Sequence, residues 1–243
     1  MSPVPLYTAS PPDAALDTAL SHALLRRAVT GEEALRLWTP PAAMSFGKLD
    51  LLSPASERAI AVARSGGLTP VRRLAGGRAA PIGPTTVCVG WACPGSEIAD
   101  VQRRYETMAA ALVCGLGQLG IEGGPGELPG EWCPGSWSIL VGQGKVAGLA
   151  QRVVRGGAWA EAVVVVSGST ALRSTLDKVQ RALGVDWDPS TLSALADAQP
   201  GLTVARAAQA LCSELGSRFD ALPGTLAEAT WIEAKSLREQ HAL

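Results

Sequence analysis

The fold is decided by the stretch that runs from residue 137 to residue 166: WSILV (137–141), GQG (142–144), KVAGLAQRVV (145–154), RGG (155–157) and AWAEAVVVV (158–166). Three apolar runs are separated by two short, glycine-rich connections. Runs of this composition favour β-strands, and short connections that contain glycine favour tight hairpins. We therefore predict three consecutive antiparallel strands, at Trp137–Val141, Lys145–Val154 and Ala158–Val166.

Helices and further strands alternate outward from this stretch. Strand patterns occur at Leu35–Trp38, Ala43–Gly47, Pro70–Ala75 and Thr85–Trp91. Helical spacing of apolar residues occurs at Pro12–Val29, Pro54–Arg64, Glu97–Leu119 (with Ser96 as a candidate N-cap), Thr170–Leu183, Thr203–Phe219 and Thr225–Gln240. Helices interleaved with strands that include two hairpins indicate an α/β (α+β) fold with a mixed, largely antiparallel sheet and flanking helices.

The composition bounds the size and class of the protein. A chain of 243 residues with 47% hydrophobic residues can bury the core of one domain, so we expect a single catalytic domain over 1–243, with 170–243 as its mostly helical C-terminal part. A net charge of -1 argues against nonspecific nucleic-acid binding, and no apolar run approaches the roughly 20 residues that cross a bilayer. The N-terminus has no secretory pattern. We expect a soluble, cytoplasmic protein that binds neither nucleic acid nor membrane.

The cysteines do not indicate a disulfide framework or a metal site. They are Cys88, Cys93, Cys114, Cys133 and Cys212. An odd number in a chain of ordinary domain size is typical of reduced thiols. Cys88 and Cys93 have no second pair in register, and the two histidines lie near the chain ends, so we expect no metal. Cys114 and Cys212 fall within helical patterns and are expected in the core.

Cys133 and Lys145 are the candidates for nucleophilic catalysis. Cys133 lies in Glu131-Trp-Cys-Pro-Gly-Ser-Trp137, where proline and glycine predict irregular backbone. Only four of the 21 basic residues are lysines, and Lys145 stands in a glycine-rich hairpin 12 positions after Cys133. A neighbouring ammonium favours the reactive thiolate. The alternatives are an inert loop cysteine and a solvated turn lysine, and Cys93 lies in a similar Cys-Pro-Gly-Ser string.

A second candidate segment places Arg72 and Arg73 shortly before the diglycine Gly76-Gly77. A diglycine turn can present backbone N–H groups to a carboxylate or carbonyl oxygen, with the arginines as ionic partners. An exposed edge strand followed by a loose turn remains the alternative.

Together these segments resemble the biotin/lipoate protein ligase and octanoyltransferase superfamily. The resemblance rests on RRLAGG at 72–77 and GKVAGLAQR at 144–152, covers about 35–166, and implies a class-II-synthetase-like, biotin protein ligase-like mixed sheet. It implies that Lys145 lies at the acyl site and that 72–77 line the acyl channel. The implied site residues are Cys133 and Lys145 as catalytic groups, and Arg72, Arg73, Gly76, Gly77, Gly148, Ala150 and Gln151 as substrate-binding groups.

The string WCPGSW at 132–137 is most similar to the cysteine-dependent octanoyl transferases and amidotransferases, whose nucleophile maps onto Cys133. ATP-dependent lipoate ligases usually carry an Asn-Asp pair before the lysine strand, a third glycine after the diglycine and a His-Gly after the lysine hairpin. Those regions here are Ser136–Ser138, Arg78 and Trp159–Glu161. These departures disfavour adenylation chemistry.

The resemblance implies an acyltransferase that moves an octanoyl or lipoyl group, through a thioester on Cys133, to the lysine of a lipoyl domain. Lys145 would stabilise the thiolate and shuttle protons, and N–H groups near Gly76-Gly77 or in the Lys145 hairpin would stabilise the oxyanion. The implied partners are lipoyl domains of 2-oxoacid dehydrogenases or the glycine cleavage H protein, with acyl carrier protein as a further donor. No cofactor is required. The alternatives are an ATP- and magnesium-dependent lipoate-protein ligase and a non-catalytic acyl-binding homologue.

Overall fold

A computed structural model describes residues 3–243, and its centre is a mixed sheet of eight strands in the order β11-β1-β2-β6-β10-β9-β8-β7. The strands are β1 (Val4–Tyr7), β2 (Ala34–Trp38), β6 (Thr86–Pro94), β7 (Gly124–Gly126), β8 (Ser138–Val141), β9 (Gly144–Val154), β10 (Gly157–Val165) and β11 (Ala221–Pro223). All pairs are antiparallel except those that β1 makes with β2 and with β11. The predicted mixed, largely antiparallel sheet is confirmed.

The three predicted strands are β8, β9 and β10, and they pair as consecutive hairpins. Gly142 and Gly156 adopt positive φ angles of 57° and 87° in the two turns, a conformation that glycine tolerates without steric cost. β10 is buried along nearly its whole length because it lies between β9 and β6 and has helices on both faces. This central hairpin fixes the position of Lys145 at the start of β9.

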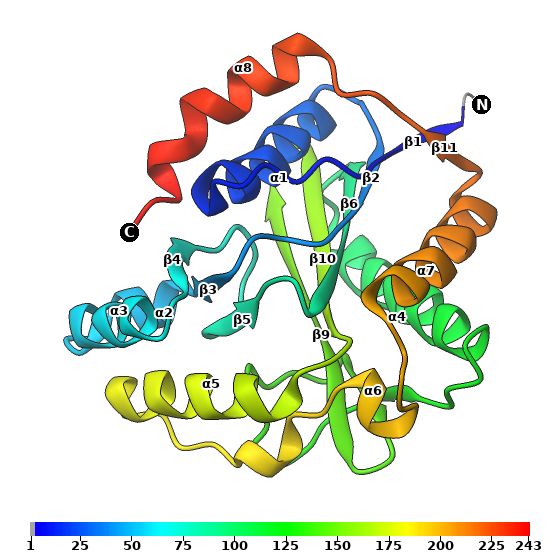
Figure 1. The fold of residues 1–243 in the computed structure, drawn as a ribbon. Coiled ribbons are helices and arrows are strands. Elements are labelled where there is room, and N and C mark those ends of the chain that lie inside the picture. The colour runs from blue at the N-terminus through cyan, green and yellow to red at the C-terminus, as the bar shows by residue number, and fades with distance from the viewer. Residues whose placement is uncertain (1–2) are drawn as a thin grey trace.

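Helices cover both faces of the sheet (Figure 1). They are α1 (Ala14–Val29), α4 (Ile98–Gly117), α5 (Ser169–Leu183), α6 (Leu195–Ala198), α7 (Val204–Phe219) and α8 (Glu228–Leu237). One face packs against α4 and α7, and the other packs against α1, which α8 covers in turn. α1 begins where Asp13 accepts hydrogen bonds from the N–H groups of Ala15 and Leu16. None of the described helices is long and apolar enough to span a membrane.

A small sheet of three strands lies beside the large one in the order β4-β3-β5. Its strands are β3 (Ala43–Phe46), β4 (Thr69–Arg72) and β5 (Ala80–Ile82), and helices α2 (Lys48–Leu51) and α3 (Ser56–Ser65) connect β3 to β4. The strand predicted over Pro70–Ala75 stops at Arg72, because Arg73 leaves the sheet to enter the site described below. The segment between β4 and β5 carries the Gly76-Gly77 turn.

The C-terminal tail returns to this small sheet. The ring of His241 hydrogen-bonds to the Arg72 carbonyl oxygen at 2.8 Å and to the ring of His22 on α1 at 3.0 Å. Burial, together with the positive charges around it, lowers the pKa of His22 to about 4. Two neutral imidazoles therefore anchor the end of the chain to the strand that leads into the site.

Two local expectations were wrong. Ser96 does not cap α4; the cap is Glu97 without a side-chain hydrogen bond, and the Ser96 hydroxyl accepts the N–H of Gly156 instead. Cys114 is exposed rather than in the core, because it lies on the side of α4 that faces Arg218 and solvent. Cys212 is half-buried against the core between the sheet, α4 and α7.

Candidate active site

The loop that carries Cys133 is held in an unusual backbone conformation. Cys133 has a φ angle of 45°, in the left-handed region that a residue with a Cβ rarely adopts, and its side chain is half-buried. The buried carboxylate of Glu131 accepts the N–H groups of Gly135 at 3.0 Å and Leu128 at 3.2 Å, and the Ser138 hydroxyl at 2.6 Å. These bonds close the loop on itself, so the strained cysteine stays in place.

Two donors from the diglycine segment converge on the Cys133 sulfur. The backbone N–H of Arg78 lies 3.2 Å from Sγ, and the guanidinium Nη1 of Arg73 lies 3.5 Å from it. Sγ also lies against Gly77, where an added Cβ would stand only 2.5 Å from the sulfur. Glycine at 77, with its φ of 106°, therefore brings the backbone donor up to the thiol. A thiolate at this position would receive a hydrogen bond and an adjacent positive charge.

Arg73 is fixed by its own partners. Its side chain is only 6% exposed, and it donates to the Arg78 carbonyl at 2.9 Å and to the Glu161 carboxylate at 3.2 Å. Glu161 in turn accepts the indole N–H of Trp159 at 2.9 Å. Burial opposes the charged form of Arg73, but a thiolate at Cys133 and the carboxylate of Glu161 would both favour it, and the pKa of Arg73 lies above its usual value. The guanidinium therefore stays charged beside the sulfur.

Lys145 makes a different set of contacts from the one we expected. Its ammonium donates to the carbonyl oxygens of Trp132 at 2.7 Å and Cys133 at 2.9 Å, and it pairs with Glu131 at 3.1 Å. These three acceptors match the three N–H donors of an ammonium. The side chain is fully buried, and burial lowers the pKa of Lys145 although Glu131 opposes the shift. Lys145 thus holds the backbone of the cysteine loop, and the cationic group within hydrogen-bond distance of the sulfur is the Arg73 guanidinium.

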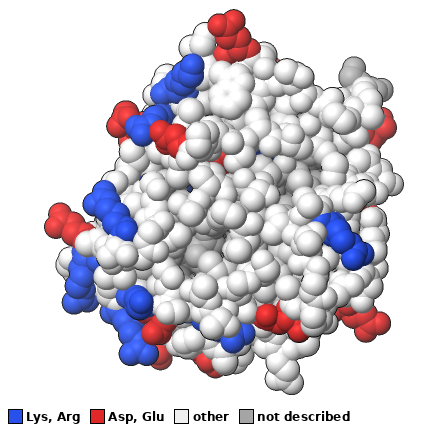
Figure 2. Space-filling view, viewed as in Figure 1, with Lys and Arg blue, Asp and Glu red and all other residues white. Residues whose placement is uncertain are grey.

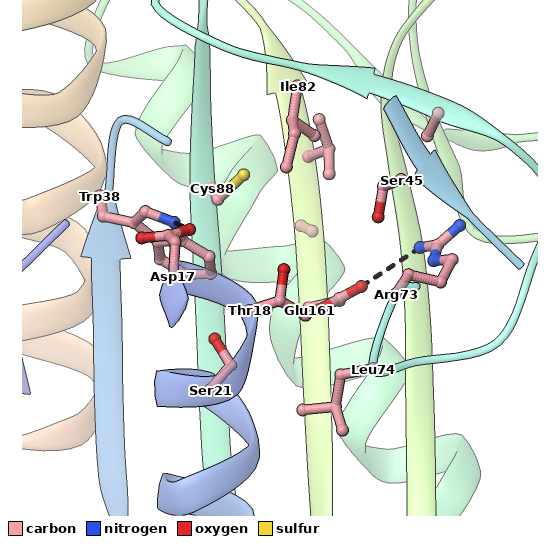
Figure 3. Close-up of a pocket in the computed structure, with 13 residues that line it drawn as sticks. Asp17, Thr18, Ser21, Trp38, Ser45, Arg73, Leu74, Ile82, Cys88 and Glu161 are labelled. Atoms are coloured by element: carbon pink, nitrogen blue, oxygen red, sulfur yellow. Dashed lines mark hydrogen bonds and ion pairs between the residues drawn. The ribbon is translucent and has the colours of Figure 1, made fainter. Parts of the chain in front are cut away.

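Behind Arg73 lies a small cavity of about 30 Å³, shown in Figure 3, whose lining mixes polar and apolar side chains. Asp17, Ser21 and Ser45 line it, together with the Arg73–Glu161 pair and the thiol of Cys88. The Arg73 Nε atom is buried without a hydrogen-bond partner among the described residues. A volume of this size holds about two water molecules. The cavity therefore offers space for water beside the unpartnered Arg73 Nε atom.

On the other side of Cys133 the site opens to solvent. A pocket of about 190 Å³ contains Cys133, with Trp137, Leu149 and Ala150 as its apolar wall. It shares Gly76, Gly77, Pro134 and Gln151 with a larger cleft of about 710 Å³. The thiol thus lies in an open pocket with an apolar wall, next to the larger cleft.

The remaining residues of the sequence hypothesis meet around this opening. Arg72 is exposed in the large cleft, and Gly76 and Gly77 line both the cleft and the pocket. Gly148 lies beside Lys145, where a Cβ would approach Nζ to 3.5 Å. The Gln151 side chain is engaged with α4, accepting from Arg104 and donating to the Val101 carbonyl, while its backbone oxygen accepts the N–H of Gly76.

Sequence reasoning missed three residues of the site. Glu131, which is buried, and Glu161, which is partly buried, hold Lys145 and Arg73, and Asp50 binds both the N–H of Gly47 and the Arg78 guanidinium. A signal existed for Glu161, because it is the one charged residue in the apolar stretch Ala158–Val166. Within residues 3–243, no three Cys, His, Asp or Glu side chains gather as metal ligands.

The sequence of this chain matches a known protein family and proteins of known name. The sequence profile of the lipoyl protein ligase A/B catalytic domain matches residues 13–216. The chain is 31% identical over 163 residues to an octanoyl-[GcvH]:protein N-octanoyltransferase of Geobacillus kaustophilus, covering 67% of this chain and 57% of that protein. A protein of the same name from Anoxybacillus flavithermus is 29% identical, with 67% and 59% covered. The matched part is thus less than two thirds of these relatives' length.

This chain also shares its fold with proteins of known structure. It matches a lipoate-protein ligase A bound with ATP with a TM-score of 0.81 and 17% identity, covering 98% of this chain and 95% of the other. It matches the bipartite lipoate protein ligase of Thermoplasma acidophilum, from a study of that ligase and its E2 lipoyl domain, with a TM-score of 0.78 and 16% identity, covering 99% and 93%. At such identities the agreement concerns the fold alone.

Proposed function

The chain belongs to the lipoyl protein ligase A/B catalytic domain family, and on that premise we propose that it is an acyltransferase that moves an octanoyl or lipoyl group to the lysine of a lipoyl domain. The names of the matched relatives support the octanoyl group and a GcvH-type partner. Cys133 is the proposed nucleophile. The observation that carries this assignment is the convergence of the Arg78 N–H and the Arg73 guanidinium on its sulfur.

The proposed reaction has two steps. The Cys133 sulfur attacks the acyl carbonyl of a donor, which is an acylated carrier protein, and forms a thioester while the thiol proton leaves with the departing amine or thiol. The neutral amine of a lipoyl-domain lysine then attacks the thioester, forms an amide and returns the proton to sulfur. Arg73 and the Arg78 N–H lie where they can stabilise first the thiolate and then the oxyanion.

Lys145 supports this chemistry by positioning. Its ammonium binds the carbonyl oxygens of Trp132 and Cys133, and these bonds set the direction in which the Cys133 side chain leaves the loop. A direct part for Lys145 in proton transfer stays a prediction. The acyl chain would pack on the apolar wall formed by Trp137, Leu149 and Ala150.

The reaction proposed here requires no nucleotide, because the donor already carries an activated or exchangeable acyl bond. An odd number of cysteines without a disulfide framework fits a reducing compartment, and we place the protein in the cytoplasm.

Intact-mass measurement tests the proposal. The protein is incubated with an octanoylated carrier, with and without ATP and magnesium, before and after a lipoyl domain is added. We expect Cys133 to gain one octanoyl group without ATP and to lose it to the lipoyl domain. Strict dependence on ATP with free octanoate as donor would identify a ligase, and acyl binding without any covalent mass would identify a non-catalytic binder.

A further inference from the structure

Arg104 is a buried cation on the inner face of α4. It is only 1% exposed, and it follows the same helical spacing as Met108 and Leu112, which pack into the core. An arginine is rarely buried in this way unless a negative charge accompanies it, because the removal of an unpaired charge from water is costly. The position of Arg104 therefore calls for a counter-charge.

Arg104 lacks the carboxylate that comparable arginines have. The side chains of Arg36 and Arg73 are also almost fully buried, and each pairs with a carboxylate, at 2.6 Å and 3.2 Å. Arg104 forms no ion pair with any described residue. Its Nε atom donates to the neutral amide of Gln151 at 2.9 Å, and its buried Nη2 atom has no hydrogen-bond partner in the part of the chain that the structure describes.

Charges at the surface do not need such a partner. Figure 2 shows that the charged side chains on the face it draws lie mainly towards the edge, while the centre is almost uncharged. Exposed charges are hydrated, so an unpaired one costs little. This compensation is not open to the buried Nη2 atom of Arg104, and its counter-charge has to come from a bound group.

A cavity of about 290 Å³ adjoins Arg104 between α4 and the end of β6. Its lining includes Trp91 and Cys93 on β6, Arg103 and Thr107 on α4, and Glu33. The volume is close to the lower end of the roughly 300–1,000 Å³ that is typical of small-molecule pockets. We propose that this cavity binds a small molecule through a carboxylate or phosphate group, which supplies the counter-charge of Arg104.

The lining residues beside Arg104 suit an anionic group. Thr107 adds a hydroxyl that can donate a hydrogen bond, and Arg103 adds a second guanidinium at the rim, where Asp100 pairs with it at 2.9 Å. Cys93 supplies no negative charge, because burial raises the pKa of its thiol to about 11. The planar guanidinium of Arg104 matches the geometry of a carboxylate or a phosphate.

Glu33 determines how the small molecule lies in the cavity. Its carboxylate accepts the indole N–H of Trp91 at 2.8 Å and forms no ion pair with any described residue. Like charges repel, so the anionic group lies at the α4 side, against Arg104 and Thr107. The rest of the molecule then lies towards Trp91.

Gln151 separates this cavity from the Cys133 pocket. Its side chain accepts the hydrogen bond from Arg104, and it lines the Cys133 pocket together with Tyr105, the neighbour of Arg104 on α4. The proposed anion site thus lies one side chain away from the thiol pocket. Binding there needs neither an acyl group nor a lipoyl domain, so it does not depend on the function proposed above.

Titration of the unacylated protein with anions tests the site. The parent, Arg104→Met and the control Arg206→Gln, a change at an exposed arginine on α7, are titrated separately with inorganic phosphate and with succinate, at an ionic strength kept constant with chloride. We expect at least one of the two anions to raise the Tm of the parent and the control and to shift the indole N–H NMR signal of Trp91, which the spectrum of Trp91→Phe assigns. Arg104→Met should weaken this binding at least tenfold (about 1.4 kcal/mol).

The two anions distinguish the sources of the charge. A response to phosphate alone would identify a phosphorylated ligand, and a response to succinate alone would identify an organic acid. Equal changes in Tm in the parent and in Arg104→Met, or no change beyond that in chloride, would overturn the proposal.

Two further variants keep the proposal testable if Arg104→Met does not fold. Glu33→Gln removes the repelling carboxylate and keeps an acceptor for Trp91, so it should tighten anion binding about threefold. Thr107→Val removes the hydroxyl and should weaken binding about fivefold. Affinities equal to that of the parent in both variants would show that the anion binds elsewhere.

Discussion

The tetrapeptide Cys-Pro-Gly-Ser occurs twice in this chain, at 93–96 and at 133–136, and the two copies have different environments. Cys93 lies on β6, in register with Ala158 of β10, and is 6% exposed. Its burial raises the pKa of its thiol to about 11. Cys133 lies in a loop at a positive φ angle, half-buried, with the Arg78 N–H and Arg73 directed at its sulfur. The same tetrapeptide therefore begins at the buried end of a strand in one place and in a loop with a candidate nucleophile in the other. The two environments differ because different segments, distant in the sequence, pack on each copy.

The largest expected effect is the loss of transfer when the loop thiol is removed. Cys133→Ser should reduce acyl transfer to a lipoyl domain by at least about 10³-fold, because the hydroxyl is a far weaker nucleophile at neutral pH. Cys93→Ser should keep transfer within about twofold of the parent while the fold is retained. Intact mass and circular dichroism check both. Equal losses of acyl transfer in Cys133→Ser and Cys93→Ser would show that the two cysteines do not differ in function.

Alkylation rates measure the contrast directly. A thiol with a pKa of about 11 is only about one thousandth ionised at pH 8, so Cys93 should react slowly with iodoacetamide until the pH approaches that value. We expect Cys133 to react at least about 100-fold faster than Cys93 at pH 8. Peptide mass mapping gives the rate for each cysteine, with exposed Cys114 as the reference for an accessible thiol. Label found first on Cys93 would show that the other loop is the reactive one.

Lys145 tests how the reactive loop is held. Lys145→Ala removes both carbonyl contacts and leaves Glu131 buried without its partner, at a cost of about 3–5 kcal/mol in the free energy of unfolding. Transfer and Cys133 alkylation should both fall, by about tenfold or more. Lys145→Arg should keep Cys133 comparatively easy to alkylate while transfer slows.

The double variant Lys145→Met/Glu131→Gln serves as the control for stability, because it removes both buried charges together. It should recover much of the lost unfolding free energy but not the transfer rate, since neither new side chain restores the ammonium contacts to the loop. If folded Lys145→Ala protein alkylates and transfers like the parent, Lys145 is an ordinary turn residue.

Gly77 and Gly95 both adopt positive φ angles, and they provide a matched pair of positions. Gly77 lies beside the Cys133 sulfur, and Gly95 belongs to the tetrapeptide that contains Cys93. Gly77→Ala and Gly95→Ala both incur about 1–2 kcal/mol of backbone strain. Only Gly77→Ala also places a Cβ 2.5 Å from the Cys133 sulfur, whereas the Cβ at 95 would meet Asp100 at an ordinary 3.8 Å. We expect Gly77→Ala to slow transfer by about tenfold and Gly95→Ala to affect thermal stability alone. A transfer rate unchanged by Gly77→Ala would show that acyl transfer does not depend on the close contact between Gly77 and the Cys133 sulfur.

The smallest expected effect concerns pH and the C-terminal tail. The pKa of His22 falls from 6.5 to about 4 in the folded protein, so its neutral form stabilises the fold above pH 6.5 and that stabilisation is lost as pH falls towards 4. Thermal unfolding at a series of pH values should therefore show a steeper fall in Tm between 6.5 and 4 for the parent than for His22→Gln. Parallel curves would show that protonation of His22 is not coupled to unfolding.

Much of the fold followed from local pattern. The apolar runs and glycine turns of 137–166 predicted β8, β9 and β10 nearly to the residue, because a hairpin depends on neighbours in sequence. The short strands β1, β5, β7 and β11 were missed, since three or four residues carry little periodic signal and depend on a partner strand. Gly47 and Asp50 were missed for a related reason, because their roles are visible only where the Gly77 backbone packs on Gly47 and the Arg78 guanidinium binds Asp50.

The sequence by itself determined the mixed sheet, the helices and the two segments from which the site is built, because hydrophobic period, turn residues and local motifs act over short distances along the chain. Only the tertiary structure decided which cation meets the sulfur. Lys145, 12 residues from Cys133, turned inwards to the loop carbonyls, while Arg73, 60 residues away, took the place beside the thiol. A buried ammonium with three donors goes to the acceptors that satisfy it, and the position of those acceptors is a property of the folded chain.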